Sequence, residues 1–330
     1  MSITEGIILG DYDIELEDEQ KTSGSRQPVP DILERHDIDP NFVASLIRGP
    51  GASGTERSLI SWTEGKEDFS GTDSTLAHLI HGPVDCDQLD YLLRDSHFTG
   101  VRHGVVDHHR LIGCMESIGG DVAIEEGGIS AIEGMLVARG LMYSAVYFHR
   151  VTRVTEVMLS RAVERSMDKL PSPEDLQRRV DSEIWGLLRN SSDFASDIIR
   201  SLIYRKLMMV CLSRRMEQLS DEQIERLVNL ARDSEARRAI EDDIAYRSGL
   251  DPGYVAIDVP SVKLLLSEPR MDQVDVRIIG DDGKTRWLRE VSPIADALRK
   301  RQVSQSAVYV MTLPGNEKKV SEISERQLFS

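Results

Sequence analysis

The sequence predicts a mainly α-helical protein with a small α/β lobe at its C-terminus. From about residue 76 to 248, apolar residues recur at the three- and four-residue spacing of amphipathic helices. Many of these segments begin at Ser or Asp, which are preferred helix N-cap residues. After Pro252 the pattern changes to the alternation typical of strands. We therefore expect a helical domain over residues 1–250 and an α/β lobe over 251–330.

The N-terminal part of the chain contains short helical segments and one long polar stretch. The sequence "DILERHDIDPNFVASLIRG" predicts two short helices that meet at Pro40, because proline favours the first turn of a helix and interrupts its interior. Residues 49–75 are rich in Gly, Ser and Thr. This composition predicts an exposed loop.

The middle of the chain is predicted to be a series of helices, and the C-terminal part a set of strands. The expected helices are 74–82, 85–97, 105–118, 129–167, 172–190, 193–218 and 220–249. The expected strands lie within 254–260, 274–288 and 306–314. Asp282-Gly283 is a strong turn signal, so the second of these segments predicts a β-hairpin.

Composition and charge limit the partners and the compartment that we expect. The net charge of −16 disfavours nucleic acid as a partner, because binding to its backbone depends on Lys and Arg displacing counterions. The sequence shows no run of about 18 apolar residues and no basic-then-apolar leader, so we expect no membrane span and a cytoplasmic protein. The three cysteines are expected to be reduced, since their number is odd.

The segment 85–97 carries an unusual set of polar side chains for one short helix. In a helix, Asp87, Tyr91 and Asp95 recur at i, i+4 and i+8 and lie on one face. Carboxylates are ligands for hard metal ions and acceptors for sugar hydroxyls, and a phenol can pack against a sugar ring. This face could therefore bind a nucleotide or a sugar phosphate. It could also be the solvated face of an ordinary amphipathic helix.

The same segment, "DCDQLDYLLRDSHFTGV", resembles the D-x-D-x-x-D-Y-x-x-R-D-x-x-x-x-G-V segment of HD-domain phosphohydrolases, in particular the deoxynucleoside triphosphate triphosphohydrolase branch. The resemblance implies an HD-domain-like helical body, a divalent metal ion such as Mn, Fe, Mg or Zn, and a dNTP-like nucleotide as substrate. It also implies assembly into homo-oligomers.

The resemblance assigns roles to several residues of this first segment. Asp87 matches the last ligand of the family's H…HD…D metal centre, and Tyr91 and Asp95 match positions that meet the deoxyribose. Gln88 stands where the family often has a phosphate-contacting Lys, so the resemblance places it among the expected substrate-binding residues. His97 matches a position near the pocket. We assign no catalytic residue.

A second segment, "ARGLMYSAVYFHRVTRVTEVML", resembles another helix of the same family. Arg139 falls on a phosphate-binding Arg, and a guanidinium fork suits phosphate oxygens. Tyr147 falls on a Tyr beside the sugar and the base, and His149 matches a further position near the pocket. Phe148 stands where the family can have a base-reading Gln, so the base preference is not carried over.

The sequence departs from the family upstream of these segments. The family's first metal-binding His and its His-Asp pair are not found; His36-Asp37 lies in a context that resembles a surface linker. We expect the chain to begin just after the region that carries those ligands. A substituted metal site could instead combine His78 and His81 with Asp85 or Asp87.

Three functions remain open from the sequence. The first is a metal-dependent phosphohydrolase that converts a dNTP into a deoxynucleoside and triphosphate, incomplete or inactive as written. The second is a non-catalytic module, derived from that family, that binds nucleotides or serves in assembly. The third is a helical scaffold without a ligand.

Overall fold

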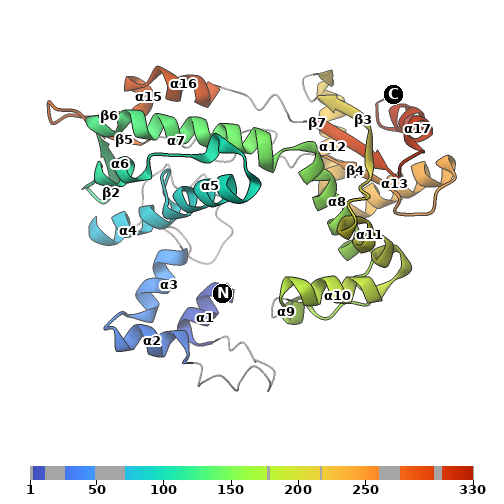
Figure 1. The fold of residues 1–330 in the computed structure, drawn as a ribbon, viewed down its shortest axis with the longest axis horizontal. Helices are drawn as coiled ribbons and strands as arrows, with labels where there is room; N and C mark the ends of the chain where they lie inside the picture. Colours follow the sequence, from blue (N-terminus) through green and yellow to red (C-terminus); the bar gives the residue numbers. More distant parts are fainter. Residues whose placement is uncertain are drawn as a thin grey trace. The chain divides into compact units, whose positions relative to one another are not determined.

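The computed structural model describes residues 3–11, 27–48, 71–176, 179–215, 218–259, 276–300 and 307–329. The chain forms two compact units, shown with their elements in Figure 1. The first unit consists of Met1–Arg139 and Gln273–Arg299, and the second of Gly140–Asp272 and Lys300–Ser330. The fold is mainly α-helical, as predicted.

The first unit combines helices with a four-stranded sheet of order β1-β2-β5-β6. The β1–β2 and β5–β6 pairs are antiparallel, whereas β2 and β5 are parallel. The strands are Met115–Ile118 (β1), Asp121–Glu125 (β2), Arg277–Ile279 (β5) and Thr285–Trp287 (β6). The helices are Ile3–Leu9 (α1), Val29–Arg35 (α2), Pro40–Arg48 (α3), Gly71–His81 (α4), Cys86–Thr99 (α5), His108–Gly113 (α6), Ile129–Met142 (α7), Leu288–Val291 (α15) and Pro293–Lys300 (α16).

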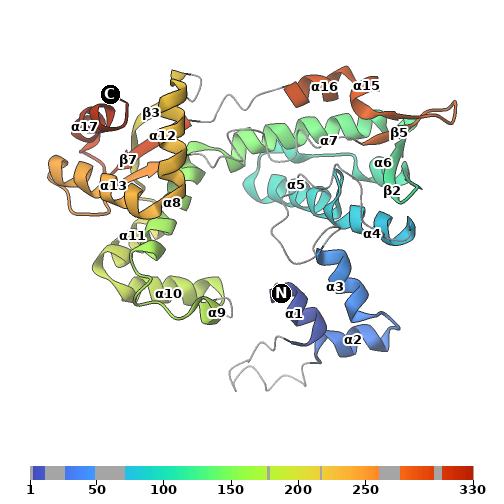
Figure 2. The ribbon, with the colours of Figure 1, turned by 180° about the vertical axis from the view of Figure 1, so that it is seen from behind.

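The second unit is built around a three-stranded antiparallel sheet of order β3-β7-β4. The strands are Met209–Arg215 (β3), Val255–Asp258 (β4) and Ala307–Thr312 (β7). The helices are Arg150–Glu164 (α8), Pro173–Leu176 (α9), Asp181–Ser191 (α10), Asp193–Ile203 (α11), Asp221–Arg232 (α12), Ser234–Ser248 (α13) and Glu317–Leu328 (α17), drawn from behind in Figure 2.

The sheet of the second unit has a hydrophobic core on each face, because successive strand residues point to opposite sides. Val255 and Ile257 pack with α12, α13 and α17. Ala256, between them in sequence, packs with α8 and α11 on the other face. Met311 of β7 belongs to the same cluster as Ala256. The strands are therefore buried on both sides, as their continuous apolar sequence requires.

The C-terminal strands form where the sequence predicts them, but they do not stay together. β4, the β5–β6 hairpin and β7 lie within the three predicted segments, and Gly283 in the hairpin turn has φ of 72°. β5 and β6 extend the sheet of the first unit, whereas β4 and β7 join β3 in the second. The division of the chain therefore differs from the boundary expected at residue 250.

Two predicted helices are each divided in two, 172–190 into α9 and α10 and 220–249 into α12 and α13, and three others contain other structure. The segment 105–118 is helical only to Gly113 and then forms β1, because a hairpin turn at Gly119-Gly120 pairs β1 with β2. The segment 193–218 forms α11 and then β3. The segment 129–167 is interrupted by a π-helical turn at Tyr143–Tyr147 and by an extended residue, His149, before α8.

Part of the predicted loop 49–75 is also different. Residues 71–75 belong to α4, whereas residues 49–70 lie outside the described part of the chain. The two helices expected around Pro40 are confirmed as α2 and α3, and α3 begins at Pro40.

One run of described residues has the length and composition of a membrane span. Glu126–Tyr147 has a mean hydropathy of 1.2, and 44% of its apolar window is buried inside the protein. Core helices of globular proteins share these properties, and α7 carries fully buried Ile132, Met135 and Met142. The run does not by itself indicate a membrane protein.

Candidate functional site

Helix α5 is defined by its two ends. Asp85 is its N-cap residue, and one oxygen of its carboxylate accepts a hydrogen bond from the backbone N–H of Gln88 at 2.7 Å. Gly100 ends the helix in the left-handed conformation. At Gly82, before the helix, an added Cβ would lie 2.2 Å from the carbonyl oxygen of His78. The sequence thus places the start and the end of α5 through local side-chain and backbone chemistry.

A buried polar network links the start of α5 to Arg139 of α7. The side-chain N–H of Gln88 donates to the second carboxylate oxygen of Asp85 at 3.0 Å. Its carbonyl oxygen accepts from Nη1 of Arg139 at 3.4 Å. All three residues are only 1% exposed. Two segments that lie 51 residues apart in the sequence therefore meet inside the first unit.

The other predicted residues of α5 differ in exposure. Asp87 is exposed in the first turn, Tyr91 and Asp95 are half-buried, and His97 is exposed near the last turn. The ring of His97 meets that of Phe98 edge-on, with centroids 5.2 Å apart. Tyr91 and Asp95 are thus partly accessible to solvent, and their predicted role beside a sugar remains a prediction.

Tyr147 and His149 belong to the second unit. Tyr147 ends the π-helical turn, and its ring contacts that of Tyr143 with centroids 5.0 Å apart. His149 is the N-cap residue of α8, and its Nδ1 accepts a hydrogen bond from the backbone N–H of Val151 at 3.2 Å. Because Nδ1 is the acceptor, Nε2 carries the proton of the neutral ring. The predicted role of both residues beside a nucleotide remains a prediction.

The histidines considered as alternative metal ligands have other partners. Nδ1 of His78 lies 3.2 Å from the carbonyl oxygen of Gly120 and 3.7 Å from the carboxylate of Asp121. Nε2 of His81 lies 2.9 Å from the carbonyl oxygen of Ile47. Both rings therefore connect α4 to neighbouring backbone.

A fit to a metal ion can be tested on the described residues. Among them, no group of three or more His, Cys, Asp or Glu side chains is arranged to hold a metal ion. A catalytic divalent ion requires several converging ligands, and Asp87 can supply only one. In the described part of the chain, these residues do not fit the family's metal centre.

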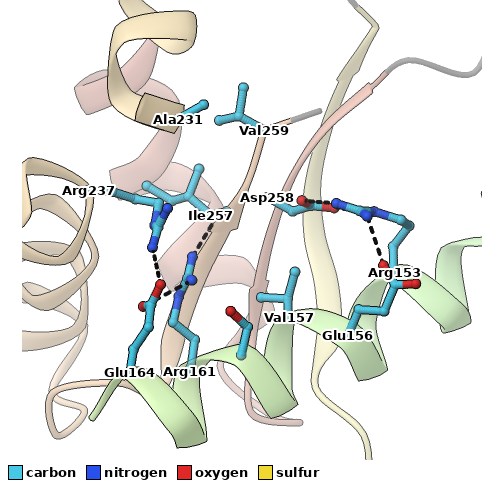
Figure 3. A pocket seen from close by; sticks show the side chains of 11 residues that line it. Arg153, Glu156, Val157, Arg161, Glu164, Ala231, Arg237, Ile257, Asp258 and Val259 are labelled. Carbon is cyan, nitrogen blue, oxygen red and sulfur yellow. Dashed lines mark hydrogen bonds and ion pairs between the residues drawn. The ribbon is translucent and has the colours of Figure 1, made fainter. Parts of the chain in front are cut away.

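A cavity in the second unit contains a cluster that the sequence analysis missed. The cavity has a volume of about 300 Å³ and is lined by side chains of α8, α12, α13 and β4 (Figure 3). At one end Arg153 binds the carboxylate of Asp258, with an Nε–Oδ2 distance of 3.0 Å. At the other end Arg237 donates to Glu164, which also accepts from Arg161 at 3.2 Å. Each of these guanidinium groups is thus paired with a carboxylate.

The most deeply buried member of this cluster is Glu241, which is fully buried behind the cavity. Nη2 of Arg161 lies 2.7 Å from its Oε1, and the backbone N–H of Ile257 donates to the same oxygen at 2.9 Å. Burial raises the pKa of Glu241, and the charge of Arg161 opposes this shift. The Arg and Glu residues recur at helical spacing in α8, a signal that the sequence analysis did not use. The cluster joins α8, α13 and β4.

The comparison with known proteins decides the family of the chain. Residues 106–329 match the model of the HD-associated region. The chain belongs to this family. The HD-associated region includes Arg139, Tyr147 and His149, whereas the predicted residues of α5 precede the matched part.

Curated relatives of this HD-associated chain carry names without a function. It is 32% identical over 256 residues to the uncharacterized protein MJ1154 of Methanocaldococcus jannaschii, which covers 76% of this chain and 52% of that protein. It is 40% identical over 88 residues to the uncharacterized protein YwfO of Bacillus subtilis, covering 27% of this chain and 20% of that protein. The chain thus spans at most about half the length of these relatives.

Two solved structures share the fold. A phosphohydrolase, BT4208, of Bacteroides thetaiotaomicron superposes with a TM-score of 0.58 at 21% identity, over 86% of this chain and 70% of that one. A hypothetical protein of Aquifex aeolicus gives a TM-score of 0.54 at 20% identity, over 98% of this chain and 75% of that one. At this level of identity the likeness shows a common fold.

Proposed function

We propose that the chain is the substrate-facing part of an HD-family phosphohydrolase that acts on nucleoside triphosphates and yields a nucleoside and triphosphate. Membership in the HD-associated family and a fold shared with a protein named as a phosphohydrolase support the reaction class. The observation that carries the proposal is the hydrogen bond between Arg139 and Gln88. It joins the two segments whose sequences resemble the nucleotide site of the family.

The proposed roles follow from side-chain chemistry. Arg139 would bind the phosphate chain, because a guanidinium donates paired, charge-assisted hydrogen bonds to phosphate oxygens. Tyr91 would pack against the sugar, and Asp95 would accept a hydrogen bond from a sugar hydroxyl. Arg139 is buried and holds a long bond to Gln88, so a phosphate would have to reach its guanidinium beside that bond.

Asp87 is the predicted contribution of this chain to metal binding. Its carboxylate is exposed in the first turn of α5, where a metal ion and the remaining ligands of the family could approach it. The described residues supply no complete ligand set, so we derive no reaction step through a metal ion. A second candidate function, nucleotide binding without turnover, is favoured by the same arrangement around Asp87.

Hydrolysis and binding can be measured on the same sample. With Mn²⁺ or Mg²⁺ present, the chain is incubated with each dNTP, and deoxynucleoside and triphosphate are quantified by chromatography. Unfolding is followed in parallel, since a ligand at 100 times its Kd stabilises the folded state by about 2.7 kcal/mol. Product together with a thermal shift supports the phosphohydrolase, and a shift without product supports the binding module.

A matched pair of variants tests the role of Asp87. Asp87 and Asp90 are both exposed acids of α5, and Asp90 is paired with Arg94 at 2.8 Å on the surface. We expect Asp87→Asn to remove metal-dependent stabilisation and any turnover, and Asp90→Asn to leave both within twofold, because an exposed pair contributes about 1 kcal/mol or less. Equal behaviour of the two variants would contradict the assignment of Asp87. If the unaltered chain shows neither a thermal shift nor product with any dNTP, the helical scaffold without a ligand is the function that remains.

A further inference from the structure

We propose that Gln88 is a positioning residue for Arg139, and that Asp85 in turn fixes the orientation of Gln88. This inference rests on the proposed function, in which Arg139 binds phosphate, and it changes the role expected for Gln88. The sequence suggested that Gln88 contacts the substrate directly. Its burial and its side-chain hydrogen bonds to Asp85, Arg139 and the carbonyl oxygen of Gly82 instead place it beside Arg139.

The chemistry of the two neighbours determines which way the amide of Gln88 points. An ionised carboxylate only accepts hydrogen bonds, so the N–H₂ of Gln88 must face Asp85. A guanidinium only donates, so the carbonyl oxygen of Gln88 must face Arg139. The reversed amide would set its carbonyl oxygen against the acceptor oxygen of Asp85 and its N–H₂ group against the donor N–H of Arg139. The orientation is therefore specified by charge as well as by geometry.

The position of Asp85 is itself fixed by the backbone. One of its oxygens caps α5 through the N–H of Gln88, which leaves the other oxygen to hold the side chain of the same glutamine. The N-cap of α5 and the guanidinium of α7 are thus connected through one side chain. A displacement of the amide would be transmitted directly to Arg139.

Other residues at position 88 would not satisfy both neighbours. A Glu would place a second carboxylate beside Asp85, and a Lys would place a second cation beside Arg139; like charges in a buried environment repel strongly. An Asn is shorter by one methylene group and could not span both partners. The family's frequent Lys at this place, which can reach phosphate itself, is replaced here by a group that orients a different cation.

The bond from Arg139 to Gln88 can hold the guanidinium without taking the place of a phosphate. Its length of 3.4 Å is longer than the usual 2.9–3.0 Å for N–H···O, so it is weak. A charge-assisted bond from a guanidinium to a phosphate oxygen is shorter and about twice as strong. Gln88 can therefore hold the guanidinium in place before a phosphate arrives without competing with that phosphate.

The test is the affinity of the full-length chain for inorganic tripolyphosphate, measured by calorimetry. Gln88→Met keeps the length of the side chain and removes its hydrogen bonds to Asp85 and Arg139 together with the long one to Gly82, so we expect the affinity to fall about three- to tenfold, the scale of one or two lost hydrogen bonds. Gln88→Asn, which keeps an amide, tests the same point if the first variant does not fold. Arg139→Gln should lower the affinity further.

Two readouts separate positioning from a general loss of stability. In the Arg139→Gln background, Gln88→Met should cause no additional loss of affinity, because the residue that it positions is already removed. In Gln88→Glu, affinity should recover relative to the unaltered chain as the pH is lowered and the new carboxyl becomes protonated, since a neutral carboxyl can donate to Asp85. A variant that is merely destabilised would show neither effect.

Gln223 provides a matched control. It is a partly buried glutamine at the third position of a helix, and its amide likewise joins two groups: it accepts from the N–H of Ser220 at 3.0 Å and donates to the carbonyl oxygen of Phe329 at 2.9 Å. Gln223→Met should leave tripolyphosphate affinity unchanged. If Arg139→Gln loses affinity but folded Gln88→Met or Gln88→Asn does not, the positioning role of Gln88 is overturned while the phosphate contact of Arg139 stands. An unaltered chain that binds no tripolyphosphate overturns the proposed phosphate contact and with it this inference.

Discussion

At the scale of single residues, local partners decide what each polar group can do. Asp85, which the sequence analysis considered only as an alternative metal ligand, is committed to capping α5 and to holding Gln88. A sequence signal was available, because an Asp followed three residues later by Gln is a pattern of helix N-termini. The burial of Arg139 had no such signal, since it depends on which helix packs against α7.

The three cysteines illustrate the same point and give a testable prediction. Cys86 is exposed at the first residue of α5, and Cys114 is buried. Burial raises the pKa of the Cys211 thiol to about 11, with a smaller contribution from the charge of Glu317. The thiolate is the nucleophile, and about one Cys211 in a thousand is ionised at pH 8. We therefore expect iodoacetamide to modify Cys86 first.

Mass spectrometry of the folded chain measures this order. Labelling of Cys211 should increase about tenfold per pH unit up to its raised pKa, because the ionised fraction grows in that proportion. In urea, where burial is lost, all three cysteines should react at comparable rates. If Cys211 and Cys86 are labelled equally rapidly in the folded chain at pH 8, the burial and the raised pKa of the Cys211 thiol are contradicted.

At the scale of elements, the sequence predicted helices more reliably than the short strands among them. β1 was missed because it ends the segment 105–118, whose apolar residues also fit helical spacing, and β2 lies between two predicted helices where no element was expected. Strands β4 and β7 were found because the residues after Pro252 show the alternation typical of strands. The long predicted helix is interrupted at His149, whose backbone is extended. The spacing of apolar residues gives no sign of this interruption.

The β1–β2 turn makes a prediction with a control inside the same unit. Gly120 has φ of 89°, where a side chain is strained, so Gly120→Ala should lower the free energy of unfolding by about 1–2 kcal/mol. Gly134 lies on the exposed face of α7, and an added Cβ there would meet no atom within 4 Å. Gly134→Ala should raise the free energy of unfolding by about 0.4–1 kcal/mol. Chemical denaturation checks both signs; a stabilised Gly120→Ala would refute the turn.

At the scale of the whole molecule, segments distant in sequence combine to form each unit. The residues after 250 were predicted to form a lobe of their own, yet β5 pairs with β2 and β7 pairs with β3 and β4. Within the second unit, Arg161 of α8 and Glu241 of α13 are 80 residues apart and meet beside β4. The buried pair thus fixes how two helices sit on the sheet.

Breaking that pair should be costly. Arg161→Met leaves the carboxylate of Glu241 buried without its main partner, so the free energy of unfolding should fall by about 3–5 kcal/mol. The double variant Arg161→Met/Glu241→Gln removes both charges and should lose less than Arg161→Met alone. As a control, Arg247→Ala removes an exposed pair with Asp243 of the same helix and should cost about 0.5 kcal/mol. Denaturant titrations compare them; additive losses in the double variant would argue against coupling.

The sequence by itself determined the mainly α-helical character, the ends of α5 and the C-terminal strands. These features depend on local periodicity, capping and motifs, which are written in neighbouring residues. Only the tertiary structure decided that Gln88 faces Asp85 and Arg139 rather than solvent, and which strands pair within each unit. Burial and pairing depend on contacts between residues far apart in the chain, and apolar spacing alone carries no information about which segments meet.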